Sequence, residues 1–174
     1  VNDMIDAQEA DGNVPGIVPT SWHWDSNWAG PMWDAAIFIT PHLLYQYSGD
    51  TRAIETIYPA AKRYLEYLQT REEANGTINH GLGDWLFYKA QTPVDFMATC
   101  FYYWDNVLMA QMARLTGREP EAAPYEAKAE KLKVLINELF FDPEKVCYSN
   151  GTQLSYALPL YVGIVPEQYE KRLA

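Results

Sequence analysis

Tryptophan and acidic residues gather in two loop-like stretches of this 174-residue sequence. The first stretch, SWHWDSNWAGPMWD at residues 21–34, holds four of the chain's six tryptophans among Ser, Asp, Asn, Gly and Pro, which are typical of loops. The second stretch, INHGLGDWLFY, holds another tryptophan. In both stretches a tryptophan adjoins an acid, with Trp33 before Asp34 and Trp85 after Asp84.

Sugars are the ligands that suit such a mixture of side chains. Pyranose rings have apolar C–H faces that stack on indole, and they have hydroxyls that need carboxylate or amide partners. A concave surface lined by Trp, Asp, Asn and His therefore favours carbohydrate binding. The candidate binding residues are Trp28, Trp33, Asp34, His80, Asp84 and Trp85.

Several of these loop and aromatic residues also have a purely structural interpretation. We expect Trp22 and Trp104 to pack against other side chains rather than to bind a ligand. Asp34 could cap the helix that follows it, an interpretation as good as a contact to a sugar hydroxyl. Capping explains Asp84 less well, which favours a binding role for it, whereas His80 could be only a hydrogen-bonding loop residue.

The charge and the metal-binding residue types exclude several classes of partner. Thirteen Lys and Arg against 23 Asp and Glu give a net charge of −10, so we predict no binding to nucleic acid or to an anionic membrane surface. No apolar segment is long enough to span a bilayer. We predict no metal or other cofactor, because no metal-ligand spacing occurs among His23, His42, His80, Cys100 and Cys147. Both cysteines are expected to be buried free thiols.

Two kinds of helix must position these stretches. Three segments are apolar on nearly every face, which indicates burial on most sides, at residues 31–47, 93–116 and 152–162. Between them lie helices with one apolar stripe and an opposite charged face, at residues 51–73 and 120–141, and a further one is expected from Pro166. No stretch alternates as a strand does, so the predicted fold class is all-α.

The order of these helices predicts a repeat of helical hairpins. The apolar helices begin about sixty residues apart, which indicates inner apolar and outer amphipathic helices in a double-layered ring. The long connections, residues 75–92 and 142–151, lead from outer to inner helices and should share one rim, where function commonly resides. Trp33 and Trp85 should therefore lie close together on that rim, with Asp84 near them.

Ordered motifs along nearly the whole chain resemble one enzyme family. They are DGNVPGIVPT, PMWDAA, YQYSGDTRAIETIYPAAKRYLEYL, GDWL, MATCFYYWDNVLMAQMARLTGR and QLSYALPLYVGIVPE. The set resembles the catalytic domain of bacterial α-L-rhamnosidases, glycoside hydrolase family 78, whose helical hairpins form an (α/α)6 barrel. The resemblance implies that residues 1–174 are a partial domain, truncated at both ends, that supplies about half of such a barrel.

The resemblance also implies a mechanism and a set of pocket residues. Inverting enzymes of this kind use one protonated Glu to assist the leaving group and a second Glu to activate water. The acid is expected upstream of this chain and the base downstream, so no catalytic residue is expected within it. The rhamnose-pocket tryptophans of the family match Trp33 and Trp85, with Asp84 beside the second. The family often has Trp-Gly-Asp where this chain has Trp33 directly before Asp34, which leaves the role of Asp34 open.

The predicted partner is a rhamnose-containing glycoside or polysaccharide, from which the whole enzyme would release terminal α-L-rhamnose. Two other functions stay open: a different six-hairpin glycosidase acting on glucosyl or uronyl units, and a helical carbohydrate-binding module without catalysis. Missing hairpins should cover apolar faces of the inner helices, so we expect the isolated chain to self-associate and to be inactive. The sequence does not distinguish a bacterial cytoplasmic location from a periplasmic or secreted one.

Overall fold

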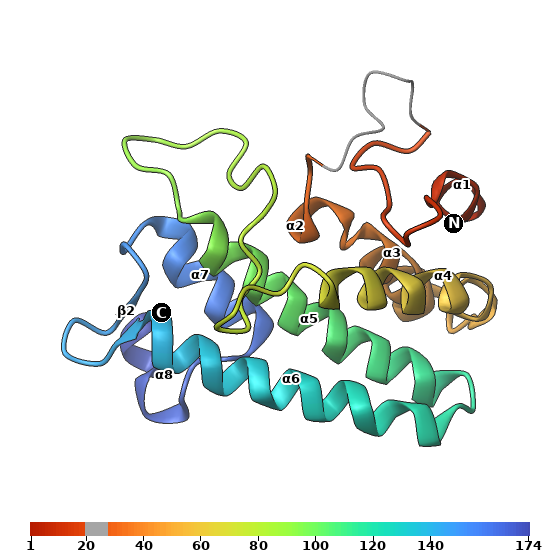
Figure 1. Ribbon diagram of the computed structural model, residues 1–174. Coiled ribbons are helices and arrows are strands. Elements are labelled where there is room, and N and C mark those ends of the chain that lie inside the picture. The colour runs from red at the N-terminus through yellow and green to blue at the C-terminus, as the bar shows by residue number, and fades with distance from the viewer. Residues whose placement is uncertain (20–27) are drawn as a thin grey trace.

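The computed structural model describes residues 1–19 and 28–174 as consecutive helical hairpins (Figure 1). The helices are α1 (Asn2–Ala7), α2 (Pro31–Asp34), α3 (Ala36–Ser48), α4 (Arg52–Gln69), α5 (Val94–Leu115), α6 (Glu119–Phe140), α7 (Gln153–Val162) and α8 (Glu167–Leu173). Strands in the described residues are confined to a short antiparallel hairpin of β1 (Phe141–Asp142) and β2 (Cys147–Tyr148). The all-α prediction is confirmed, and this small hairpin is the part that it missed.

The helices alternate between two layers in chain order, as predicted. The inner helices α3, α5 and α7 each pack against the outer helix that follows, which is α4, α6 or α8 respectively. The inner helices also contact one another, α3 with α5 and α5 with α7. Figure 1 shows α5 and α6 side by side along most of their length. This arrangement places the starts of the inner helices on a common side of the molecule.

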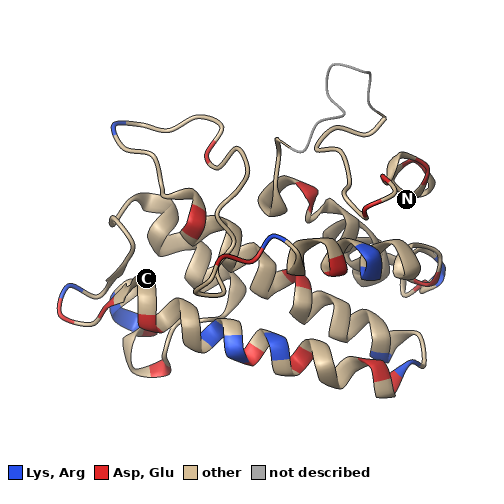
Figure 2. Cartoon of the chain, in the orientation of Figure 1, with Lys and Arg blue, Asp and Glu red and all other residues tan. Residues whose placement is uncertain are grey.

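The amphipathic pattern explains the outer layer. The predicted apolar stripe of α4 is buried throughout, at Ile54, Ile57, Ala61, Tyr64, Leu65 and Leu68. Figure 2 shows that many of the charged residues lie on α4 and α6. The stripe of α6 is less complete: Leu132 and Ile136 are buried, but Leu139 is 49% exposed. Leu139 belongs to the last turn of α6, beyond which the chain turns away into β1.

Two helix boundaries differ from the sequence-based expectation. The first inner segment, predicted as one helix, is broken at Ala35, so that α2 ends at Asp34 and α3 begins at Ala36. The helix predicted to reach residue 73 ends at Gln69, because the chain turns there and folds back on itself through a bridge between Glu72 and Ile78. From Ile78 the chain continues as a loop to Val94, where α5 begins.

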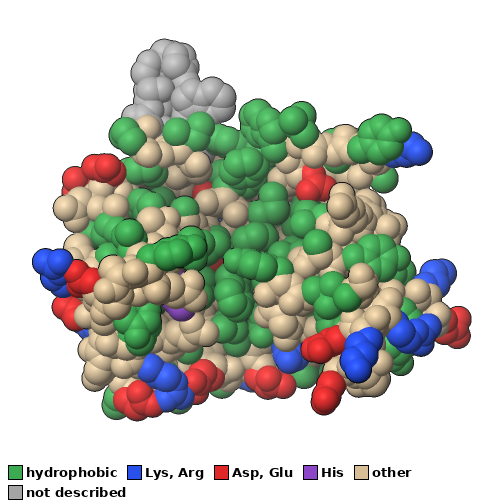
Figure 3. All heavy atoms as spheres, turned by 180° about the vertical axis from the view of Figure 1, so that it is seen from behind, with side chains coloured by type: hydrophobic (Ala, Val, Ile, Leu, Met, Phe, Trp, Pro, Cys, Tyr) green, Lys and Arg blue, Asp and Glu red, His purple; other side chains and the backbone are tan. Residues whose placement is uncertain are grey.

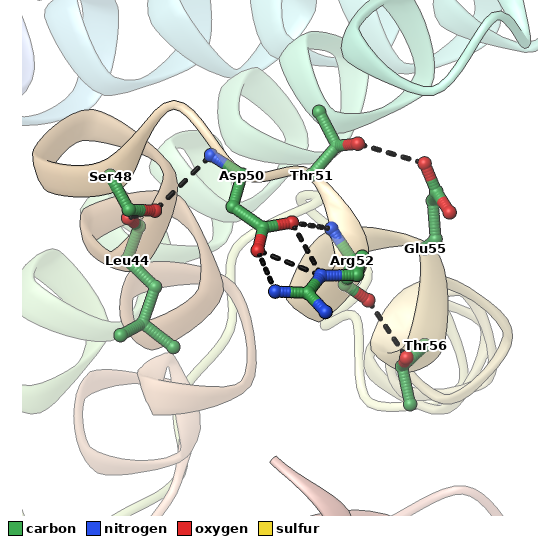
Figure 4. A network of polar contacts seen from close by, with 7 residues as sticks. All are labelled: Leu44, Ser48, Asp50, Thr51, Arg52, Glu55 and Thr56. Atoms are coloured by element: carbon green, nitrogen blue, oxygen red, sulfur yellow. Dashed lines mark hydrogen bonds and ion pairs between the residues drawn. The ribbon is translucent and has the colours of Figure 1, made fainter.

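A polar network closes the α3–α4 hairpin at the end of α3 that lies away from Trp33 (Figure 4). Gly49 ends α3 in the left-handed conformation, with φ at 71°. The Ser48 hydroxyl accepts a hydrogen bond from the Asp50 N–H at 3.1 Å. The Asp50 carboxylate in turn accepts from the Arg52 backbone N–H at 2.9 Å and from its Nε at 2.8 Å. This tight turn fixes how the first inner helix meets its outer partner.

The inner layer keeps apolar surface that this chain does not cover. Buried residues occur along most of α5, from Phe96 to Ala113. On α3, by contrast, Leu43, Leu44 and Tyr47 are 42%, 49% and 90% exposed. Figure 3 shows hydrophobic side chains gathering along the middle of the rear face.

Among the helices that the structure describes, none is both long and apolar enough to cross a membrane.

Candidate functional site

Three loops meet beside the N-terminal ends of α2 and α5 and together form what we call the rim, at residues 14–19, 28–30 and 78–93. Two of them cross at glycines in left-handed conformations, Gly30 at φ 75° and Gly81 at φ 121°. A Cβ atom on Gly30 would lie 2.6 Å from the Gly81 Cα, so a larger residue would force the loops apart. The Leu82 N–H donates to the Ala29 carbonyl at 3.0 Å and locks the crossing.

The crossing brings two tryptophans together. The ring centroids of Trp33 and Trp85 lie 6.0 Å apart with an interplanar angle of 68°, an edge-to-face arrangement. The Trp33 Nε1–H donates to the Gly83 carbonyl at 3.3 Å, which orients the indole toward the second loop. Both side chains remain partly open to solvent, at 36% and 59% exposure. The prediction that the two residues lie together on one rim is confirmed, while their role in binding a sugar stays a prediction.

Asp84 fixes the base of the loop that carries Trp85. Its Oδ2 accepts a hydrogen bond from the Thr92 backbone N–H at 3.0 Å, which ties together the two ends of the segment between them. The Thr92 hydroxyl lies 2.6 Å from the Thr152 hydroxyl, next to the start of α7. Asp84 therefore has a demonstrated structural contact beside its predicted contact with a ligand.

Asp34 is a buried carboxyl rather than a helix cap. It is the last residue of α2 and is 3% exposed, and the N-cap positions of α2 and α3 are Gly30 and Ala35, so the capping interpretation is wrong. The Tyr64 hydroxyl donates to Asp34 Oδ2 at 3.2 Å. Burial raises the pKa of Asp34 from 3.8 to about 8, and the hydrogen bond from Tyr64 offsets part of that rise. Asp34 is thus mostly protonated at neutral pH.

A second buried acid, Asp105 of α5, was not anticipated from the sequence. Burial raises its pKa well above the ordinary value, and the nearby charge of Asp34 adds to the rise. Asp34 Oδ1 and both carboxyl oxygens of Asp105 are buried and form no hydrogen bond with the described residues. The available signal was an acid inside the apolar run FYYWDNVLM, where a charged residue is rarely buried without a reason. Tyr64 and the two acids form a polar cluster beneath the rim.

A cleft of about 340 Å³ lies beside this cluster, a size within the usual range for ligand pockets of roughly 300–1,000 Å³. Trp33 and Asp34 line one wall, and the loop around Gly16 lines the other. A Cβ atom on Gly16 would lie 3.6 Å from Asp34 Oδ1, which places that oxygen at the edge of the loop. The cleft thus places the Trp33 indole beside a mostly protonated carboxyl whose Oδ1 is buried and has no hydrogen-bond partner among the described residues.

Solved structures share this fold. The structure of Streptomyces avermitilis α-L-rhamnosidase complexed with L-rhamnose matches with a TM-score of 0.89 at 28% identity, covering 99% of this chain and 16% of that one. The structure of α-L-rhamnosidase from Dictyoglumus thermophilum matches with a TM-score of 0.86 at 27% identity, covering 98% of this chain and 20% of that one. The chain is therefore similar to one part of larger enzymes.

Sequence comparison agrees with the structural match. Residues 1–174 match the family described as bacterial alpha-L-rhamnosidase 6 hairpin glycosidase domain. The chain belongs to this family. Its relatives include α-L-rhamnosidases of Streptomyces avermitilis, 30% identical over 173 residues, and of Alteromonas sp., 28% identical over 179 residues. These two matches include 99% and 96% of this chain but only 16% and 19% of the length of the two relatives.

Membership of the six-hairpin rhamnosidase family confirms the resemblance and the fold class inferred from the sequence. The hairpins α3–α4, α5–α6 and α7–α8 supply about half of the (α/α)6 barrel. The rim lies where the inner helices of that barrel begin.

The two remaining candidates for sugar binding, His80 and Trp28, lie on the same rim. His80 is half-buried, and its pKa is lowered by burial and by the positive charge of Arg71. Trp28 is half-buried at the start of the loop that leads to α2. Trp104 packs against Tyr161 with ring centroids 5.9 Å apart, as expected for a packing residue. The prediction that Trp22 packs as core falls on residues 20–27, which lie outside the described part of the chain.

Metal-ligating side chains do not converge in the part of the chain that the structure describes. Residues 1–19 and 28–174 hold no group of three or more His, Cys, Asp or Glu that could bind a metal ion. Cys100 and Cys147 are buried free thiols, as predicted, and burial raises the pKa of Cys100 well above its ordinary value.

Proposed function

We propose that this chain is part of an inverting glycoside hydrolase that releases terminal α-L-rhamnose from glycosides or polysaccharides, and that the rim forms walls of its sugar pocket. The observation that carries the proposal is the pairing of Trp33 with Trp85 above the cleft that Asp34 lines. Membership of the rhamnosidase family and the similarity to an α-L-rhamnosidase whose structure was solved with L-rhamnose support it.

Each residue has a distinct task in this proposal. Trp33 and Trp85 offer apolar indole surface to the C–H faces of rhamnose, and the sugar contacts exclude water from the pair. Asp34 is mostly protonated at neutral pH and buried in the wall of the cleft, where it supports the pocket without adding a charge beside the sugar. Asp84 holds the Trp85 loop in place and can offer its carboxylate to a hydroxyl. His80 and Trp28 complete the rim as further proposed contacts.

The catalytic step is assigned to residues outside this chain. An inverting glycosidase needs a general acid and a general base on opposite sides of the scissile bond, with room between them for the attacking water. We place both glutamates outside residues 1–174, since the chain spans only 16% of the length of its Streptomyces avermitilis relative. The described residues would then bind and orient the sugar without transferring a proton to the leaving group.

Kinetics of the full-length protein with a nitrophenyl α-L-rhamnoside test the proposal. Trp85→Ala should lower kcat/KM by about tenfold or more, because one stacking wall is lost, an effect of about 1.4 kcal/mol. The control is Leu139→Ala, which removes an apolar side chain that is 49% exposed on the outer helix α6. The control should retain wild-type kinetics, and both variants should keep the wild-type melting temperature.

Other outcomes would point to the alternative functions. Hydrolysis of an aryl glucoside or uronide in preference to the rhamnoside would indicate a different six-hairpin glycosidase. Binding of L-rhamnose without turnover of any glycoside by the full-length protein would indicate a carbohydrate-binding module. A large loss of thermal stability in Trp85→Ala with unchanged kinetics would show that this indole is a packing residue.

A further inference from the structure

The tip of the second rim loop exposes a continuous run of large apolar side chains. Trp85, Leu86, Phe87 and Tyr88 are 59%, 86%, 53% and 86% exposed. Loops that only connect helices are usually built from small and polar residues, because large apolar side chains gain nothing from contact with water. Four consecutive side chains of this kind therefore mark a contact surface.

The base of this loop is anchored on both sides. Asp84 Oδ2 accepts from the Thr92 N–H at 3.0 Å, and the Asn150 side-chain amide donates to the Gln91 carbonyl at 2.8 Å. On the other side, the Gly83 carbonyl accepts the hydrogen bond from the Trp33 indole. These contacts join the two ends of the loop to each other and tie them to α2 and to the segment before α7. The tip between the two ends projects from the body of the protein.

The tip also has local structure of its own. Lys89 adopts a left-handed conformation with φ at 68°, and the Ala90 N–H donates to the Tyr88 carbonyl at 2.9 Å. The Lys89 ammonium lies 5.1 Å from the centroid of the Tyr88 ring, a cation–π contact that orients this ring. The turn at Tyr88–Ala90 thus has a defined backbone conformation, which helps to fix the exposed side chains before it.

The position of the tip follows from Trp85, which belongs to both the tip and the tryptophan pair. Trp85 lies 6.0 Å from Trp33, centroid to centroid, and Leu86, Phe87 and Tyr88 continue the loop from there. Figure 1 shows this loop on the same side of the molecule as the loop that leads into α2. A sugar held at the tryptophan pair would therefore lie beside the tip, and a group attached on that side of the sugar would meet it.

The side chains of the tip discriminate between kinds of attached group. Leu86 and Phe87 offer no hydrogen-bonding group, so the hydroxyls of a second sugar would lose water there without gaining partners. An aromatic ring, by contrast, can pack edge-to-face or offset on Phe87 and Tyr88 and loses little on leaving water. The tip therefore suits an aryl group better than a second sugar, whose hydroxyls would find a hydrogen-bonding side chain there only at Tyr88.

We infer that Leu86, Phe87 and Tyr88 bind the leaving group of the substrate and favour glycosides in which rhamnose is attached directly to an aromatic ring. The inference rests on the proposed function, because it assumes that the tryptophan pair holds the rhamnose unit. It assigns these three residues to specificity and gives them no part in proton transfer.

The test uses the full-length protein and two substrates, a nitrophenyl α-L-rhamnoside and a disaccharide with terminal α-L-rhamnose. A variant that combines Leu86→Ser, Phe87→Ser and Tyr88→Ser should lose about tenfold in kcat/KM for the aryl substrate, as expected for lost aromatic contacts worth about 1.4 kcal/mol. Its kcat/KM for the disaccharide and its inhibition by free L-rhamnose should stay within about twofold of wild type. The control is Leu139→Ser, an exposed apolar residue on the outer helix α6, which should change the kinetics on neither substrate.

Each contrary result has a separate meaning. Equal losses on both substrates would overturn the assignment to the leaving group, since the tip would then serve the sugar itself or the shape of the loop. Unchanged kinetics on both substrates would overturn it as well, because the tip would then contact something other than substrate. A wild-type protein that hydrolyses neither rhamnoside would instead overturn the proposed function, and this inference with it.

Discussion

The buried carboxyl of Asp34 should make the stability of the fold depend on pH. Its pKa is about 8 in the folded chain, compared with 3.8 for a solvated aspartate. The unfolded chain therefore releases this proton at a lower pH than the folded chain does. Between about pH 4 and pH 8 the unfolded state gains stability relative to the folded state as pH rises.

The size of the effect follows from the shift in pKa. Each pH unit in this window should lower the free energy of unfolding by about 1.4 kcal/mol through Asp34 alone. Over the whole interval from 3.8 to about 8 this amounts to about 6 kcal/mol, with most of the loss present at pH 7. The side chain is only 3% exposed, so solvent screening removes little of this effect.

The substitution Asp34→Asn isolates this contribution. The amide has nearly the same shape, can still accept the hydrogen bond from Tyr64, and cannot ionise. The variant should match the wild type in stability near pH 4 and should become more stable than the wild type by several kcal/mol at pH 7 to 8. Urea unfolding at several pH values, followed by tryptophan fluorescence, measures the difference. Glu138→Gln, at an exposed position on α6, serves as the control and should show no such divergence.

Identical stability of wild type and Asp34→Asn from pH 4 to pH 8 would refute this reasoning, because Asp34 would then ionise without cost. A variant that is less stable than wild type at every pH would show that the carboxyl makes contacts that an amide cannot replace. Asp105 retains its own burial in this variant, so part of the wild-type slope should persist. The double substitution with Asp105→Asn should flatten the remaining slope.

Three further results are expected. Gly30→Ala should lower the free energy of unfolding by more than about 1 kcal/mol, since the new Cβ would lie 2.6 Å from the Gly81 Cα; equilibrium unfolding with wild-type stability would contradict the close crossing. The isolated 174-residue chain should self-associate through apolar residues such as Leu43, Leu44 and Tyr47, so light scattering that shows only monomers would contradict an uncovered inner layer. The same isolated chain should not hydrolyse aryl α-L-rhamnosides, and turnover abolished by Asp84→Asn would show that the catalytic acid lies on the rim.

The sequence predicts much of the helical framework because the helices follow simple burial patterns. The stripe of α4 from Ile54 to Leu68 has a period that only an amphipathic helix satisfies, and the structure buries all of it. The nearness of Trp33 and Trp85 follows from the same repeat, since each precedes an inner helix. The exposure of Leu139 does not follow, because it depends on where α6 ends against the small hairpin β1–β2.

The polar cluster beneath the rim required three-dimensional information. Asp34 and Asp105 lie on different helices and share surroundings only once α2 packs on α5. The hydroxyl that contacts Asp34 belongs to Tyr64, which the pattern of α4 places correctly in the core but does not orient. A capping residue and a buried acid look alike at the start of a helical segment, so the sequence could not distinguish them.

The most direct test of the account is a crystal structure of the full-length protein with L-rhamnose bound. We predict that the sugar contacts the indoles of Trp33 and Trp85 and occupies the adjoining cleft that Trp33 and Asp34 line. Rhamnose bound elsewhere, with both tryptophans and the adjoining cleft free of the sugar, would contradict the central claim that this rim is the wall of the sugar pocket.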